Sequence, residues 1–176
     1  GPDDVILALR HPSIFGDLPR ATQVDLIEKP DKLIPHDVIK VLDNTLHKMI
    51  NGIKFQIAGS YRRKKPTSRD VDLVMSRGLW KTSLSAWKSF IKQIHKSRVV
   101  KFHTPFAGGD DKLSVLVTVK ISQNVLNNIK KIHPNEIRFH KRVWKLKTDV
   151  FVTAPSEYMY MMLYATGSGN WNVMMR

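Results

Sequence analysis

The chain has 176 residues, of which 29 are Lys or Arg and 15 are Asp or Glu, and its formal net charge at pH 7 is +14. A chain of this length can hold one domain with a substantial core. The charge predicts a polyanionic partner, with nucleic acid favoured over an anionic membrane surface. Cysteine is absent, which excludes disulfides and thiolate metal sites. No apolar stretch reaches the length of a membrane span and no signal peptide is recognisable, so we expect an intracellular protein without membrane partners, in the nucleus or in a viral or cytoplasmic compartment.

The first strong element is an amphipathic helix expected over residues 37–50. Its apolar side chains recur at helical spacing, Pro35 precedes it, and the Asn-Gly pair at 51–52 ends it. Ahead of this helix, prolines interrupt the chain and leave room only for a short helix over residues 22–28. We therefore expect residues 1–52 to form a helical N-terminal segment.

Two strands with an unusual carboxylate pair follow this helix. The β-rich stretch 54–58 reads as a buried strand, and residues 70–75 read as a second one. Because side chains alternate along a strand, Asp70 and Asp72 would share one face, about 7 Å apart at the backbone. Two unpaired carboxylates this close repel each other and lose hydration, so the pair predicts a cation, and Mg²⁺ suits oxygen ligands best.

A glycine-serine turn and two arginines separate the two strands. Gly59 and Ser60 would give a turn whose backbone N–H groups can approach a phosphate closely. Arg62 and Arg63 add fixed positive charge. A glycine-serine turn that occurs alone is often only a surface turn. An Asp-x-Asp pair that occurs alone is often only part of a solvated strand face. Joined at this spacing, the two are far more specific and match what phosphoryl or nucleotidyl transfer needs.

The second half of the chain alternates between helical and strand periodicities. It is expected to begin with a helix over residues 83–95, with Ser83 as its N-cap. Strands over 99–102 and 112–120 follow, joined by a hairpin turn at 108–111. The last expected elements are an amphipathic segment over 125–132, a strand over 142–152 and a helix over 155–164.

The motif Gly-Ser-Tyr-Arg-Arg at 59–63, followed by Asp-Val-Asp at 70–72, resembles the nucleotidyltransferase signature of the family X DNA polymerases. Residues 34–37, Ile-Pro-His-Asp, are similar to the family's start of the helix that precedes the palm. Both motifs occur in the family's order along the chain.

The resemblance continues to the end of the chain. Residues 164–168, Tyr-Ala-Thr-Gly-Ser, with Asn172 and Arg176 behind them, are similar to the family's tyrosine-containing segment. Asp149 stands ahead of that tyrosine where the family has its third metal carboxylate. The similarity thus covers roughly residues 26–176.

This resemblance implies an α+β fold. The expected architecture is a nucleotidyltransferase palm over residues 53–176, with a mixed, mainly antiparallel sheet flanked by helices. Residues 1–52 would be a small helical, fingers-like segment in front of it. The C-terminal end would begin the thumb, and the rest of the thumb is expected to be absent from this chain.

The resemblance also implies the residues of the site. The catalytic residues, which would also hold two Mg²⁺ ions that Mn²⁺ can replace, are Asp70, Asp72 and Asp149. The residues implied to bind the nucleotide are Gly59, Ser60, Arg63, Ser68, Tyr164, Gly167 and Asn172. Those expected to bind DNA are Arg62, Lys147 and Arg176.

The function implied is that of a DNA-directed DNA polymerase. It would add dNMP to a primer 3′-hydroxyl by two-metal-ion nucleotidyl transfer, on primer-template or gapped DNA, in gap filling or end joining. We expect a monomer that takes dNTP as substrate. Two alternatives stay open: a template-independent or RNA-directed nucleotidyltransferase, and a nucleic-acid-binding module without catalysis.

Overall fold

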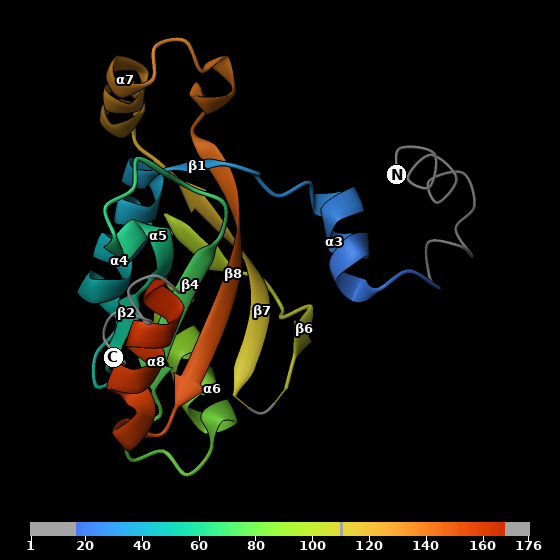
Figure 1. Ribbon diagram of the computed structural model, residues 1–176, viewed down its shortest axis with the longest axis vertical. Helices are drawn as coiled ribbons and strands as arrows, with labels where there is room; N and C mark the ends of the chain where they lie inside the picture. Colours follow the sequence, from blue (N-terminus) through green and yellow to red (C-terminus); the bar gives the residue numbers. More distant parts are fainter. Residues whose placement is uncertain (1–16, 110, 168–176) are drawn as a thin grey trace.

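The structure is a computed structural model, and it describes residues 17–109 and 111–167. At its centre is a six-stranded sheet whose main path has the order β2-β4-β8-β7-β5, with β6 paired to β7 (Figure 1). The strands are β2 (Phe55–Ile57), β4 (Val71–Ser76), β5 (Val100–Phe102), β6 (Ala107–Gly108), β7 (Lys112–Lys120) and β8 (Val143–Thr153). Strands β4 and β8 run parallel, and the other pairs of this sheet are antiparallel. The mixed, mainly antiparallel sheet is therefore confirmed.

Helices cover both faces of the sheet. The helices are α3 (Arg20–Glu28), α4 (His36–Met49), α5 (Gly59–Arg62), α6 (Ser83–Ile94), α7 (Gln123–Ile132) and α8 (Tyr158–Thr166), with 3-10 turns η1 (Ile137–Phe139) and η2 (Pro155–Glu157). Helices α4 and α6 lie on one face and α8 on the other. In Figure 1, α7 lies near one end of the sheet, and α6 and α8 lie near the other. A two-stranded ribbon of β1 (Ile34–Pro35) and β3 (Thr67–Ser68) ties the start of α4 to the segment after α5. None of these helices is long and apolar enough to cross a membrane.

The sheet separates two apolar clusters, because successive side chains of a strand point to opposite faces. Leu73 and Met75 of β4 belong to the larger cluster, which contains the buried side chains of α4 and α6. Val74 points the other way and packs with Met162 of α8. Burial of each large apolar side chain stabilises the fold by about 1.5–3 kcal/mol. The face that α8 covers is also the face of Asp72, which lies two residues before Val74.

Several element boundaries differ from the sequence-based expectation. The strand expected from Asp70 begins at Val71, so that Asp70 lies in the bend before β4. Thr82 rather than Ser83 caps α6, because the Thr82 Oγ1 accepts a hydrogen bond from the Ser85 backbone N–H at 3.1 Å. The expected boundary between residues 1–52 and 53–176 stays a prediction, although buried side chains of α4 share one cluster with the sheet.

His103, which follows β5, gives the fold a pH dependence. Its Nε2 lies 2.8 Å from the Thr118 Oγ1 of β7. Burial is the main cause that lowers the pKa of His103 below its ordinary value; Lys101 and Lys145 lower it further, and Glu28 opposes them. A lowered pKa means that the unfolded chain takes up the proton at a higher pH than the folded protein does, so protonation favours unfolding.

We expect the free energy of unfolding of the wild type, measured relative to that of His103→Gln, to decrease as the pH falls below about 6.5, the ordinary pKa of histidine. Other titrating groups are the same in both proteins, so this difference reports His103. Glutamine can still hydrogen-bond Thr118 but does not titrate. Urea unfolding of both proteins on either side of that pH measures the difference, with His95→Gln, at an exposed histidine, as the control. Parallel pH profiles of the wild type and His103→Gln would show that His103 is not the group responsible.

Candidate active site

Two of the three predicted carboxylates lie side by side in the sheet. In the parallel pair of β4 and β8, Asp72 stands directly opposite Asp149. The next pairs along the register, Leu73 with Val150 and Val74 with Phe151, keep the two strands in step. Asp70 is exposed in the bend just ahead of β4.

Electrostatics show that the three carboxylates share one environment. The pKa of Asp72 rises to about 7, chiefly because the carboxyl is buried and then because the charges of Asp70 and Asp149 repel its own. Lys112 and Arg63 act in the opposite direction with smaller effects. Asp70 and Asp149 can therefore both act on Asp72, although they come from distant parts of the chain.

Asp149 is held by two side chains of the neighbouring strand β7. The Ser114 hydroxyl donates a hydrogen bond to Asp149 Oδ1 at 2.9 Å. The Lys112 Nζ lies 3.9 Å from Asp149 Oδ2. The register explains both contacts, since Ser114 is the direct partner of Asp149 across the antiparallel pair and Lys112 lies on the same face.

The two-ion metal site stays a prediction. Among residues 17–109 and 111–167, no group of three or more His, Cys, Asp or Glu side chains is placed to hold a metal ion. The chemistry of the donors nonetheless fits a hard divalent cation. The three aspartates offer only oxygen ligands, and a cation between them would offset the repulsion and burial that raise the pKa of Asp72.

The expected glycine-serine turn is the one-turn helix α5, whose first residue lies against Asp72. Gly59 has φ +66°, in the left-handed region, and a Cβ at this position would lie 2.8 Å from Asp72 Oδ2. The Ala58 N–H donates a hydrogen bond of 2.8 Å to the Asp72 carbonyl oxygen. Only glycine therefore fits at position 59 without moving the Asp72 carboxylate.

The other residues predicted to bind the nucleotide surround α5. The Ser60 hydroxyl donates to the Ser68 Oγ at 2.6 Å, which joins α5 to β3. The Arg63 guanidinium donates to the carbonyl oxygen of Thr166 at the end of α8.

Gly167 and Tyr164 complete this group at the end of α8. A Cβ at Gly167 would collide with the Arg63 guanidinium, so the glycine lets the arginine approach. Tyr164 is exposed. The predicted residue Asn172 lies outside the described residues.

The residues expected to bind DNA are partly occupied by contacts within the chain. The Arg62 Nη1 lies 3.3 Å from Thr166 Oγ1, to which it donates. The Lys147 Nζ forms an ion pair of 2.7 Å with Asp25 of α3. Arg176 lies outside the described residues. DNA that uses Lys147 must therefore compete with an acidic side chain of the same protein.

Lys112 and Ser114 were not anticipated as site residues. Alternation within the strand expected over 112–120 places them on one face, but only the pairing of β7 with β8 shows that this face carries Asp149. Thr166 was missed as well, since only the packing of α8 brings it to the two arginines.

Comparison with known proteins shows what this fold is similar to. The DNA polymerase beta palm family matches residues 34–114. Among solved structures, Leishmania infantum polymerase beta in a ternary gap complex is similar, with a TM-score of 0.66 and 21% sequence identity over 98% of this chain and 55% of that chain. The chain thus spans about half the length of that polymerase. Comparison with the sequences of curated proteins gives no match. These findings confirm the resemblance to the family X DNA polymerases and the α+β palm.

Proposed function

We propose that this chain, in which residues 34–114 form a palm of the DNA polymerase beta family, belongs to a DNA-directed DNA polymerase of the family X type. It adds dNMP to a primer 3′-hydroxyl by nucleotidyl transfer that depends on two divalent ions. The observation that carries the proposal is the register of the parallel strands, which sets Asp72 opposite Asp149 beside the close backbone approach at Gly59.

The residues that would hold Mg²⁺ or Mn²⁺ are Asp70, Asp72 and Asp149. When bound, such ions neutralise the charge of the triphosphate and lower the pKa of the attacking hydroxyl. The support for this ligand set is the oxygen-only donor chemistry and the mutual repulsion of the three carboxylates.

The chain's own residues bind and orient the reactants. Ser60, Ser68 and Arg63 hold the β and γ phosphates of the dNTP. The primer 3′ oxygen attacks the α-phosphorus, the bond to the β-phosphate oxygen breaks, and pyrophosphate leaves. Asp149 receives the hydroxyl proton, because it is the carboxylate of β8 that stands directly opposite Asp72.

The remaining assignments concern partners and setting. The net charge of +14 supports a DNA backbone as partner, bound with a steep dependence on salt. Tyr164 and Asn172 contact the sugar and the minor-groove edge of the nucleotide, and Arg176 contacts the template strand. We propose a monomeric, intracellular repair polymerase that acts in gap filling or end joining.

A primer-extension assay tests the function directly. The protein is incubated with Mg²⁺ and a labelled primer, with and without template, and with dNTP or rNTP. We expect extension by one or a few nucleotides that requires a template and favours dNTP. Stronger extension on gapped DNA than on an open primer-template would support the repair role.

The other outcomes select the alternatives. Extension that does not need a template, or that follows an RNA strand, would replace the DNA-directed polymerase by another nucleotidyltransferase. DNA binding without incorporation, in this chain and in a longer one, would favour a non-catalytic nucleic-acid-binding module.

A further inference from the structure

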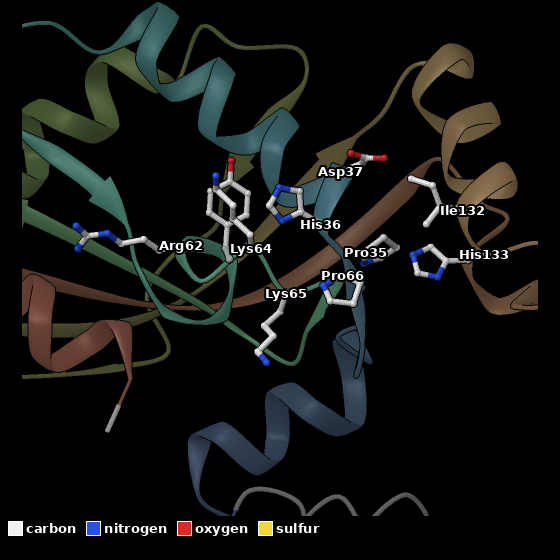
Figure 2. A pocket seen from close by; sticks show the side chains of 10 residues that line it. Pro35, His36, Asp37, Arg62, Lys64, Lys65, Pro66, Ile132 and His133 are labelled. Carbon is white, nitrogen blue, oxygen red and sulfur yellow. The ribbon is translucent and has the colours of Figure 1, made fainter. Parts of the chain in front are cut away.

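A cavity of about 480 Å³ lies at the far end of α5 from Asp72. Its lining residues are Pro35, His36, Asp37, Tyr61, Arg62, Lys64, Lys65, Pro66, Ile132 and His133 (Figure 2). They come from the start of α4, from α5 and the segment after it, and from the end of α7. The helix α5 has one turn, so only about 5 Å of backbone separates the cavity from Gly59 at the catalytic carboxylates. Of the residues predicted for the metal ions or the incoming nucleotide, those within 17–109 and 111–167 do not line this cavity.

Two stacked rings line the cavity. The rings of His36 and Tyr61 lie 4.6 Å apart between centroids, with an angle of 17° between their planes. The Tyr61 hydroxyl donates to Asp43 Oδ2 at 2.8 Å, which fixes the orientation of the ring. The His36 Nδ1 is buried and has no hydrogen-bond partner among the described residues. The stack therefore presents a ring surface of fixed orientation at the wall of the cavity.

The rim of the cavity is positively charged. Lys64 and Lys65 are exposed, and within the described residues neither forms an ion pair. Lys64 has φ +60°, in the left-handed region that costs a lysine free energy. The Lys65 N–H donates to the Ser60 carbonyl oxygen at 3.0 Å, which holds the lysine segment against α5. The acidic lining residue Asp37 is engaged, since it accepts a hydrogen bond of 2.7 Å from the Asn128 side chain.

Apolar surface completes the lining. Figure 2 shows Pro35 and Pro66 next to each other beside His133. Ile132, on the same rim, is 57% exposed and adds apolar surface. The walls are too apolar and the volume too large for a phosphate alone, whereas a cavity of 300–1,000 Å³ with apolar walls is typical of organic ligands, as about 480 Å³ is here.

We infer that this cavity binds an unpaired nucleotide of the nucleic-acid substrate, with the base packed against the His36–Tyr61 stack and its phosphate held by Lys64 and Lys65. Aromatic side chains beside cations are how proteins hold single-stranded nucleic acid, because each base has a π-face and each linkage a negative charge. The inference rests on the proposed function only in taking nucleic acid as the partner.

The test combines a change in the protein with a change in the ligand. A short DNA hairpin carries a single-stranded tail of a few nucleotides, at its 5′ or its 3′ end, and the tail contains either adenines or abasic sites. Fluorescence anisotropy measures the dissociation constants at one fixed salt concentration. For wild type, we expect the abasic tail to weaken binding by about five-fold to a hundred-fold at one of the two ends, as loss of base stacking does.

Two variants locate this effect. His36→Ala removes one ring of the stack, and the double variant Lys64→Ala, Lys65→Ala removes the rim charge without touching a buried side chain. In His36→Ala, the adenine and abasic tails should bind alike. The matched control, Lys88→Ala with Lys92→Ala, removes the same charge from exposed lysines of α6 and should keep the preference for the adenine tail.

Free deoxyadenosine monophosphate, added as a competitor, tests whether the cavity also binds a nucleotide that is not part of a DNA strand. Displacement of the adenine tail that depends on His36 would support a nucleotide site in either form. Equal binding of adenine and abasic tails by wild type, at both ends, would overturn the inference while leaving primer extension intact. If the wild type binds no oligonucleotide at all, this inference and the proposed function both fail.

Discussion

Asp149→Ala is expected to abolish nucleotide incorporation while DNA binding remains close to that of the wild type. The variant removes a carboxylate that stands opposite Asp72 and shares its environment. Loss of one ligand and of the proton acceptor removes several kcal/mol of transition-state stabilisation, which corresponds to about a thousand-fold or more in rate. Single-turnover primer extension measures the rate, and anisotropy with a primer-template measures binding.

Metal-dependent stability supplies a second readout for this variant. Mn²⁺ should raise the melting temperature of the wild type, because a ligand that binds only the folded state stabilises it. The rise should disappear in Asp149→Ala. Without metal, the variant loses a charge that repels Asp72 but also the hydrogen bond from Ser114, so its melting temperature should stay close to that of the wild type. Asp111→Ala, which removes an acidic side chain hydrogen-bonded to Ser83, is the matched control and should keep both properties. Incorporation near the wild-type rate would mean that the third carboxylate is misassigned.

Gly59→Ala is the second change with a large expected effect. The backbone there has φ +66°, and the new methyl group would lie 2.8 Å from Asp72 Oδ2. The left-handed conformation alone costs a residue with a Cβ about 1–3 kcal/mol. The contact adds a second effect, because it displaces the Asp72 carboxylate from its position. We therefore expect lower stability and an incorporation rate reduced by about tenfold or more.

Gly52→Ala separates the two effects. Gly52 also has a left-handed backbone, with φ +76°, but a Cβ there would have no neighbour within 4 Å. This variant should lose a similar amount of stability, measured by urea unfolding, and keep its incorporation rate. If Gly59→Ala and Gly52→Ala lose activity in proportion to stability alone, the contact with Asp72 does not matter.

The sequence predicted the elements well where apolar periodicity is strong. The helix expected over 37–50 and the strand expected over 112–120 are present as α4 and β7, because each presents one continuous apolar face to the core. The ends of elements were harder to place. At the start of α6 the cap is Thr82, because a hydroxyl one residue earlier than Ser83 can cap the same helix. Local propensity cannot distinguish these two caps.

The candidate site was only partly predictable. Asp149 was found by resemblance, and no local pattern distinguishes it from other acidic residues. Ser114 and Lys112 depend on the register between two strands, which single-strand alternation does not give. The cavity beside His36 could not be foreseen at all, because the end of α7 joins residues 35–37 and 64–66 only in the folded chain.

The position of β8 between β4 and β7 has a consequence for how the protein gains activity. β8 comes after both β4 and β7 in the chain and must insert between them. Pairing of Asp72 with Asp149 therefore closes a long loop of chain, and because loop closure costs entropy, this pairing is expected to form late in folding. A partly folded chain in which β2 and β4 are paired but β8 is not yet inserted does not have Asp149 beside Asp72. Recovery of catalysis during refolding should therefore coincide with the last cooperative step, whereas helical signal returns earlier.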